Sequence, residues 1–375
     1  MKISSRRVSF DGTVCGISPE QNDIFSAVDG SLIITSFWPE VAARRVRMEG
    51  YWVCGAMEAQ QGIVLLVSRQ AGGPPDDCGP LPKGHDGLIA ETGRDPSLPE
   101  PGISESDTRK NVLIILDRRD LQVVARMEAP SSGWLFPCLY PSELPNLTLI
   151  VGKVPWESSK KEVWATLSLC RVNSATLLEE WQAEVKHVVD FSIDTIGNSC
   201  HVLTEQSSQV ISLATGNIVR SDKLPTGRGI KSWARICAAA PACFLAGVSR
   251  DQSEIVLCQW SPDSGTTKVV YRAAIESLIP EAPVLSAGDI KSLHYRPGIG
   301  QVLWLPAVSR LVFELYVPAE LGSGGDMLLK GLFAVNPVSG DCFTCHAEDG
   351  CGTGSLLRVA DDRILYNELL MTFKE

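Results

Sequence analysis

The sequence predicts an all-β protein, and three observations carry this prediction. Helical patterns are scarce: only Ala273–Leu278 has the spacing of a short helix, and Pro280 ends it. Gly (32) and Pro (23) together make up 55 of the 375 residues, about 15% against a usual sum of roughly 12%. This excess favours many turns over long helices. The third observation is a strand–turn–strand unit that recurs along the chain.

Six copies of this unit can be aligned. In each, an apolar strand reaches a short turn built from Pro, Asp, Asn, Ser or Gly, and a second strand follows. The six pairs of strands are Ser31–Trp38 with Ala43–Met48, Val112–Leu116 with Leu121–Met127, Val163–Cys170 with Thr176–Val185, Gln209–Leu213 with Asn217–Arg220, Glu254–Trp260 with Thr266–Arg272, and Leu328–Val335 with Asp341–Ala347.

The spacing of the turns indicates the architecture. They fall near residues 39, 119, 173, 215, 264 and 339, so that most spacings are 40 to 55 residues once the segment 71–110 is set aside. A period of this length with four short strands is typical of β-propeller blades. One complete set of four is visible, because His187–Ile193 and Cys200–Glu205 precede the fourth pair.

A further blade is expected from both ends of the chain. The segments Leu356–Val359, Ile364–Leu370 and Met371–Phe373 supply three strands, and Ile3–Phe10 supplies the fourth. Joining the termini in one sheet removes open edges. We therefore expect a single domain over residues 1–375, a seven-bladed β-propeller closed by the N- and C-terminal strands, with six or eight blades as the alternatives.

The strand endings Val210–Gly216 and Phe333–Gly340, together with Trp260 at the close of its strand, resemble those of the WD40-like β-propeller superfamily. No Trp-Asp dipeptide occurs, and no Gly-His pair opens a blade. The resemblance covers most of the chain in architecture and implies a rigid scaffold that presents loops to partner proteins.

Residues 71–110 differ in composition from the rest of the chain. They hold seven Gly, seven Pro and eight acidic against four basic residues. Such a segment buries too little apolar surface to offset the cost of ordering it. We expect a flexible Pro/Gly/acid-rich loop inserted in the second blade. It is either a tolerated insertion or a docking segment with a phosphorylation site around Ser104–Asp107.

Charge and hydropathy exclude several classes of protein. The formal net charge of −10 and the pI near 5.1 argue against a general nucleic-acid binder. Basic doublets at Arg6-Arg7, Arg44-Arg45, Arg118-Arg119 and Lys160-Lys161 are scattered among acidic residues and leave a local basic face open. No run approaches the roughly 18 apolar residues that span a bilayer, and no apolar segment follows Arg6-Arg7 as a secretory signal requires. The expected location is the cytoplasm or the nucleus, where the twelve cysteines are thiols.

Motifs for chemistry are weak. Cys342-Phe343-Thr344-Cys345-His346 matches the c-type haem pattern, and Cys351 would complete a zinc set. Alternation along a strand, however, sends Cys342 and Cys345 to opposite faces. Nucleotide-binding, metalloprotease and serine-hydrolase motifs are absent. We therefore expect no catalytic residue, no cofactor and no metal.

Aromatic residues recur where blades should join. Trp52, Trp134 and Trp233, flanked by Arg228 and Lys231, could form a partner-binding rim, because Trp and Arg dominate interface hot spots. The alternative is that these rings pack in the core.

The sequence thus favours a non-enzymatic protein–protein interaction scaffold or adaptor, a subunit of a larger complex whose partners are proteins or peptides. The alternative is a propeller enzyme of the metal-dependent hydrolase type, with residues gathered around the central channel.

Overall fold

The structure is a computed structural model of the whole chain. It describes residues 1–18, 23–28, 30–37, 40–48, 51–59, 62–69, 110–128, 135–141, 146–153, 165–173, 178–194, 197–225, 230, 233–239, 242–261, 264–282, 297–318, 327–351 and 356–374.

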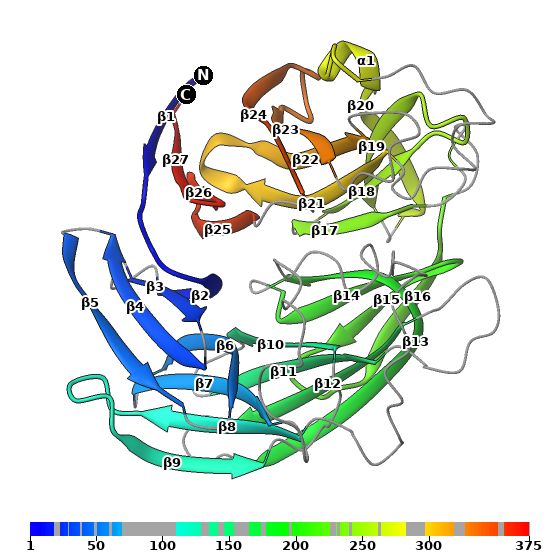
Figure 1. The fold of residues 1–375 in the computed structure, drawn as a ribbon. Helices are drawn as coiled ribbons and strands as arrows, with labels where there is room; N and C mark the ends of the chain where they lie inside the picture. The colour runs from blue at the N-terminus through cyan, green and yellow to red at the C-terminus, as the bar shows by residue number, and fades with distance from the viewer. Residues whose placement is uncertain are drawn as a thin grey trace, which may run out of the picture. The chain divides into compact units, whose positions relative to one another are not determined.

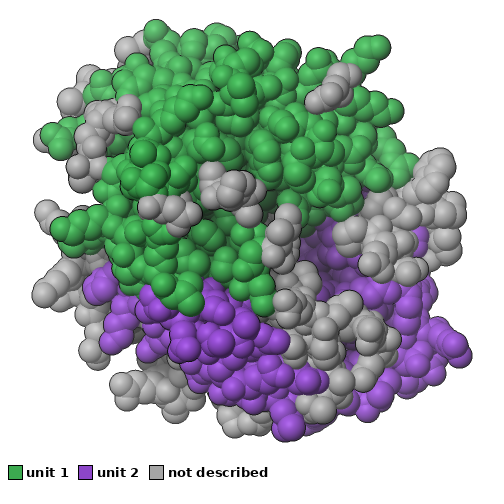
Figure 2. Space-filling view, turned by 180° about the vertical axis from the view of Figure 1, so that it is seen from behind, with its two compact units in different colours: residues 1–6, 189–210, 219–375 green, residues 7–188, 211–218 purple. Residues whose placement is uncertain are grey.

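The chain divides into two compact units, shown in different colours in Figure 2. Unit 1 comprises residues 1–6, 189–210 and 219–375, and unit 2 comprises residues 7–188 and 211–218. Each unit is built from small sheets, which are coloured along the chain in Figure 1. Among the described residues, no helix is long and apolar enough to cross a membrane.

Two four-stranded sheets belong to unit 2. The first has the order β2 (Thr13–Ser18), β3 (Asp23–Val28), β4 (Ser31–Phe37) and β5 (Glu40–Arg47). The second has the order β6 (Trp52–Ala59), β7 (Gly62–Arg69), β8 (Lys110–Leu116) and β9 (Val123–Glu128). Neighbouring strands are antiparallel in both sheets. β7 pairs with β8, so residues 70–109 connect the second and third strands of this sheet; the expected loop lies outside the described residues except for Lys110.

A seven-stranded sheet follows. Its order is β10 (Leu135–Pro141), β11 (Asn146–Lys153), β12 (Ala165–Asn173), β13 (Glu179–Asp194), β14 (Ser199–Thr204), β15 (Ser207–Ser212) and β16 (Ile218–Lys223). Its members come from both units.

Unit 1 holds the three remaining sheets. They are β17 (Arg235–Ala239), β18 (Ala242–Val248), β19 (Glu254–Ser261) and β20 (Thr266–Ala274); β21 (Gly298–Leu305), β22 (Arg310–Pro318), β23 (Met327–Val335) and β24 (Cys342–Cys351); and β1 (Lys2–Arg7), β27 (Leu369–Lys374), β26 (Arg363–Tyr366) and β25 (Leu356–Ala360). The helical elements are one α-helical turn, α1 (Ile275–Leu278), where a short helix was predicted, and a 3₁₀ turn, η4 (Pro306–Val308).

The predicted hairpins are confirmed. All six strand pairs fall on the third and fourth strands of a four-strand repeat, namely β4–β5, β8–β9, β12–β13, β15–β16, β19–β20 and β23–β24. The N-terminal strand is also confirmed in its predicted place, because β1 lies beside β27 in the last sheet. Met1 and Ile3 pack there against a buried cluster that includes Phe373.

The expected number of seven blades is wrong, because the described strands form six sheets. Two of the predicted repeats share β13, a strand of 16 residues that neighbours β12 on one side and β14 on the other. The sequence suggested a break between Val185 and His187. At that point the pairing of β12 with β13 shifts register, and His187 adopts a left-handed φ of 58°. The bulge redirects the strand without ending it.

The inner strands β7 and β19 are buried on both faces, which explains their continuous apolar runs. In β7, Ile63, Leu65 and Val67 belong to one cluster, shared with β4. The alternate residues Val64 and Leu66 belong to a second cluster, shared with β12. β19 of unit 1 behaves in the same way: Ile255 and Leu257 join one core, and Val256 and Cys258 join another.

Candidate interaction surfaces

The structure places Trp233 in the core. Its side chain is 5% exposed and packs in a cluster with Trp260 and Leu245, and its indole nitrogen donates a hydrogen bond to the carbonyl oxygen of Pro225 at 3.0 Å. A buried ring with a satisfied N–H cannot meet a partner. The interpretation of Trp233 as a rim residue is therefore wrong, and the alternative of core packing holds for it.

The other members of the predicted rim stay untested. Trp134, Arg228 and Lys231 lie outside the described residues. Trp52 begins β6, but its side chain is not among those described. The rim therefore remains a prediction for these four residues.

The cysteine–histidine motif falls on β24. Cys342 packs against the cluster that contains Phe333 and Val335, whereas Cys345 packs against the cluster that contains Tyr366. The two thiols thus contact different cores, as alternation predicts. Burial raises the pKa of Cys345 to about 12, so this thiol is protonated at neutral pH. Within the described ranges, no group of three His, Cys, Asp or Glu side chains is placed to hold a metal ion.

A buried polar network crosses the first strands of unit 1. Arg235 on β17 is 4% exposed, and its Nε donates to the carbonyl oxygens of Ile299 and Gly300 on β21 at 3.0 and 2.9 Å. Its Nη1 lies 3.8 Å from Oδ1 of Asp190 on β13, and Oδ2 of Asp190 accepts a hydrogen bond from the amide of Ile236 at 2.8 Å. The network ties three successive sheets together.

Burial raises the pKa of Asp190 to about 6, although the Arg235 guanidinium and the amide of Ile236 oppose the rise. The pairing of Asp190 with Arg235 and their hydrogen bonds to backbone groups explain why two ionisable groups are retained in the core.

One turn geometry recurs between third and fourth strands. In each copy an amide donates to the carbonyl oxygen five residues later, and four copies are described: Asp117 to Gln122 at 2.9 Å, Asn173 to Leu178 at 2.9 Å, Ser212 to Asn217 at 3.0 Å and Asn336 to Asp341 at 2.9 Å. The fifth residue of the turn has positive φ at Leu121, Gly216 and Gly340. Glycine adopts this conformation without steric cost, which is why the turns were recognisable.

The exposed large apolar side chains gather at these turns and on the strands that follow. Seven are known among the described residues, with exposed fractions from 37% to 83%: Val123, Val124, Leu178, Ile218, Val219, Val338 and Phe343. β9, β16 and β24, which carry five of them, are the last strands of their sheets. Sequence reasoning missed this recurrence, although the residues stand at matching distances after the predicted turns.

Two of the four basic doublets, Arg44-Arg45 and Arg118-Arg119, come together in unit 2. Nη1 of Arg44 on β5 donates to the carbonyl oxygen of Arg118 at 2.8 Å, although 74 residues separate them. Nη2 of Arg118 lies 2.9 Å from Oδ2 of Asp23 on β3, and its Nη1 bonds Glu58 on β6. The side chain of Asp23 is 3% exposed and also accepts a hydrogen bond from Ser36. The turn after β8 is thereby fixed against the neighbouring sheet.

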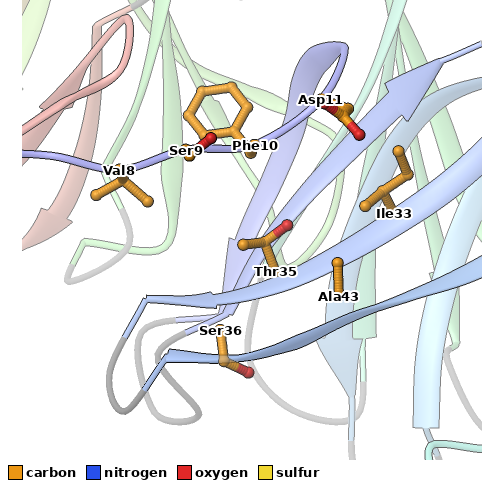
Figure 3. A pocket seen from close by; sticks show the side chains of 8 residues that line it. All are labelled: Val8, Ser9, Phe10, Asp11, Ile33, Thr35, Ser36 and Ala43. Carbon is orange, nitrogen blue, oxygen red and sulfur yellow. The ribbon is translucent and has the colours of Figure 1, made fainter.

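A small pocket lies between β4, β5 and the segment that precedes β2. It has a volume of about 260 Å³ and is lined by Val8, Ser9, Phe10, Asp11, Ile33, Thr35, Ser36 and Ala43. Figure 3 shows Ile33, Thr35 and Ala43 pointing toward the segment that carries Val8 and Asp11. The hydroxyl of Thr35 is buried without a hydrogen-bond partner among the described residues.

Comparison with known proteins supports the fold alone. No protein-family profile matches the sequence, and no curated protein sequence matches it. Among solved structures, the chain is similar to KlHsv2 with loop 6CD replaced by a Gly-Ser linker, with a TM-score of 0.50 and 10% identity over 96% of this chain and 90% of that one.

Two further structures are similar at lower scores. One is the Cps50 (Swd1) β-propeller domain of Myceliophteria thermophila, with a TM-score of 0.49 and 10% identity over 99% of both chains. The other is Hsv2 of Kluyvelomyces marxianus, with a TM-score of 0.48 and 9% identity over 94% of this chain and 88% of that one. The repeated four-strand units, the N-terminal strand in the last sheet and the similarity to KlHsv2 agree: the chain has a β-propeller fold.

Proposed function

We propose that the protein is a non-enzymatic protein–protein interaction scaffold or adaptor that acts as a subunit of a larger complex in the cytoplasm or the nucleus. The observation that carries the proposal is the recurrence of exposed apolar side chains at one position of the four-strand repeat. Val123 and Val124 follow one turn at the same distance at which Ile218 and Val219 follow another.

This recurrence is what a protein-binding surface requires. A last strand has unpaired backbone groups along its free edge, and an apolar side chain beside that edge favours pairing with another protein. Surface valines scattered singly need no explanation. Valines that return at the same position of a repeat, on strands that end their sheets, are better explained by contact with a partner.

Affinity capture of the tagged full-length chain tests the proposal. The test variant carries Val124→Lys and Val219→Lys, which place a charge on the apolar positions of β9 and β16. The control carries Gln122→Lys and Ser221→Lys, which add the same charges at exposed polar positions two residues away. We expect the valine variant to lose captured proteins that the wild type and the control retain. Equal capture by all three chains would refute this assignment of the surface.

A further inference from the structure

Four arginines on β5, on β9 and in the turn before β9 are exposed and unused by the fold. They are Arg45 and Arg47 on β5, Arg119 in the turn, and Arg126 on β9. Within the part of the chain that the structure describes, none of the four pairs with a carboxylate. By contrast, the guanidinium groups of Arg171, Arg220, Arg272 and Arg363 each pair with one. Arg45 and Arg47 lie two residues apart on β5 and give this strand a positive face in a chain of net charge −10.

The region is held rigidly. Arg44 and Arg118 precede Arg45 and Arg119 in the sequence. Their guanidinium groups are held by the network with Asp23 and Glu58. That network holds the turn between β8 and β9 against β5, the last strand of the neighbouring sheet. Arg45 and Arg119 are therefore presented from backbone whose position is already set, which lowers the entropic cost of using them.

The register of β5 gives the surface a direction. Arg45 lies opposite Ile33 and Arg47 lies opposite Ser31 on β4, so both side chains project from the same face of the sheet. Residues two apart in a strand are separated by roughly 6.5–7 Å. β5 is the last strand of its sheet, and no described strand pairs with its other side. A free backbone edge thus runs beside two evenly spaced guanidinium groups.

The chemistry of this edge selects its partner. Charged residues on an edge strand oppose pairing with a neutral strand or with a second copy of the same edge. An incoming strand with carboxylates at alternate positions reverses that effect, because opposite charges directly across a strand pair stabilise it. At physiological salt, charges beyond about 8 Å are largely screened, so that a short segment senses the arginines more than the negative chain. A long polyanion or an anionic membrane meets more of the acidic surface.

We propose that the free edge of β5 binds an extended acidic segment of a partner protein. The segment pairs with the backbone of β5 and places carboxylates at alternate positions opposite Arg45 and Arg47. The inference deepens the proposed scaffold function by naming a class of partner, but it uses none of the exposed valines.

A titration of the purified full-length chain tests the proposal. The probe is a fluorescent peptide of about eight residues that alternates Glu with Val, and binding is followed by anisotropy at physiological salt. The double variant Arg45→Glu with Arg47→Glu is compared with Lys223→Glu with Arg250→Glu, which changes the net charge equally at exposed positions of unit 1. We expect the β5 variant to weaken binding by at least about tenfold, equivalent to roughly 1.4 kcal/mol, and the control to leave binding within about twofold.

Further probes separate the backbone pairing from charge alone. The same peptide with alternate N-methylated amides keeps its carboxylates but cannot pair along an edge, so its binding should be lost. Equal affinity for the methylated peptide, or an equal loss in both variants, contradicts the proposal.

Other classes of ligand are tested in the same way. Binding of phosphatidylserine vesicles or of a single-stranded oligonucleotide that is stronger than binding of the peptide, and that Arg45→Glu with Arg47→Glu abolishes, also overturns the proposal, because it assigns the edge to another class of ligand. All the substituted residues are exposed, and unchanged midpoints of thermal unfolding confirm that the variants fold. The valine variant should bind the peptide normally, so failure of the two proposals is distinguishable.

Discussion

The indole ring of Trp181 on β13 lies against the backbone of Gly216 in the turn between β15 and β16. A β-carbon at position 216 would come within 2.5 Å of Cε3 of Trp181, and Gly216 has a φ of +72°. Two side chains also hold this turn. Nε1 of Trp181 and Nη1 of Arg171 both donate to the carbonyl oxygen of Leu213, at 3.2 and 2.8 Å. The turn is thus part of the packing of the seven-stranded sheet.

Gly216→Ala should therefore lower the free energy of unfolding by about 2–3 kcal/mol, from backbone strain and overpacking together. Gly265→Ala is the matched control, because Gly265 also has positive φ (64°) but no atom within 4 Å of an added β-carbon. It should cost only about 1 kcal/mol. Urea denaturation of both variants gives the comparison, and equal losses would show that Trp181 imposes no constraint.

The left-handed residue in β13 gives a second prediction. His187 has a φ of 58°, which β-branched residues adopt at considerable cost. His187→Val should destabilise the protein by about 1–2 kcal/mol, whereas His187→Gly should leave the stability unchanged or raise it slightly. Thermal denaturation of the two variants checks this. A valine variant as stable as the glycine variant would mean that β13 continues without the bulge.

Asp190 gives a dependence on pH. Its folded pKa of about 6 lies above the ordinary value, so the folded state binds the proton more tightly than the unfolded state. This contribution to stability is fully present below about pH 4 and declines as the pH rises to about 6. The shift corresponds to about 2–3 kcal/mol.

The variant Asp190→Asn keeps an acceptor for the amide of Ile236 but cannot titrate. The free energy of unfolding of the wild type minus that of Asp190→Asn should therefore fall by up to about 2–3 kcal/mol between pH 4 and pH 7. A difference that stays constant across this range would mean that Asp190 titrates normally.

Substitution of Trp233 tests whether this residue belongs to the core or to a binding surface. Trp233→Ala should cost about 3–5 kcal/mol, because it removes a buried ring and leaves the carbonyl oxygen of Pro225 without its donor. Trp233→Phe should cost less, because the ring is largely retained. Denaturation curves measure both. An alanine variant that keeps wild-type stability and loses captured partners would instead restore the rim interpretation.

Local signals in the sequence predicted much of the fold. In the turn at Asn336–Gly340, the Asn side chain accepts hydrogen bonds from the amides of Val338 and Ser339, and the glycine has positive φ. Asn and Gly are the residue types that favour these features, so the sequence alone predicts the turn. The apolar strands beside such turns are equally local. For this reason the six hairpins and the pairing of the two termini could be read without coordinates.

The features that sequence reasoning missed depend on contacts between distant segments. Nothing near His187 indicates that the strand continues through it, because a residue type that tolerates positive φ occurs in turns as well as in bulged strands. A tryptophan at a blade junction has the same appearance in sequence whether it faces solvent or the core, as Trp233 shows. The hydrogen bond from Arg44 to the backbone of Arg118 joins two sheets. In the sequence, these residues appear only as members of two ordinary basic doublets.

The central claim is that partners bind along the last strands of the sheets. Hydrogen–deuterium exchange of the full-length chain, alone and with a captured partner, tests it most directly. Slower exchange on binding within β5, β9 or β16 is the predicted result. Protection confined to first strands such as β6 and β17, with the last strands unchanged, would contradict it.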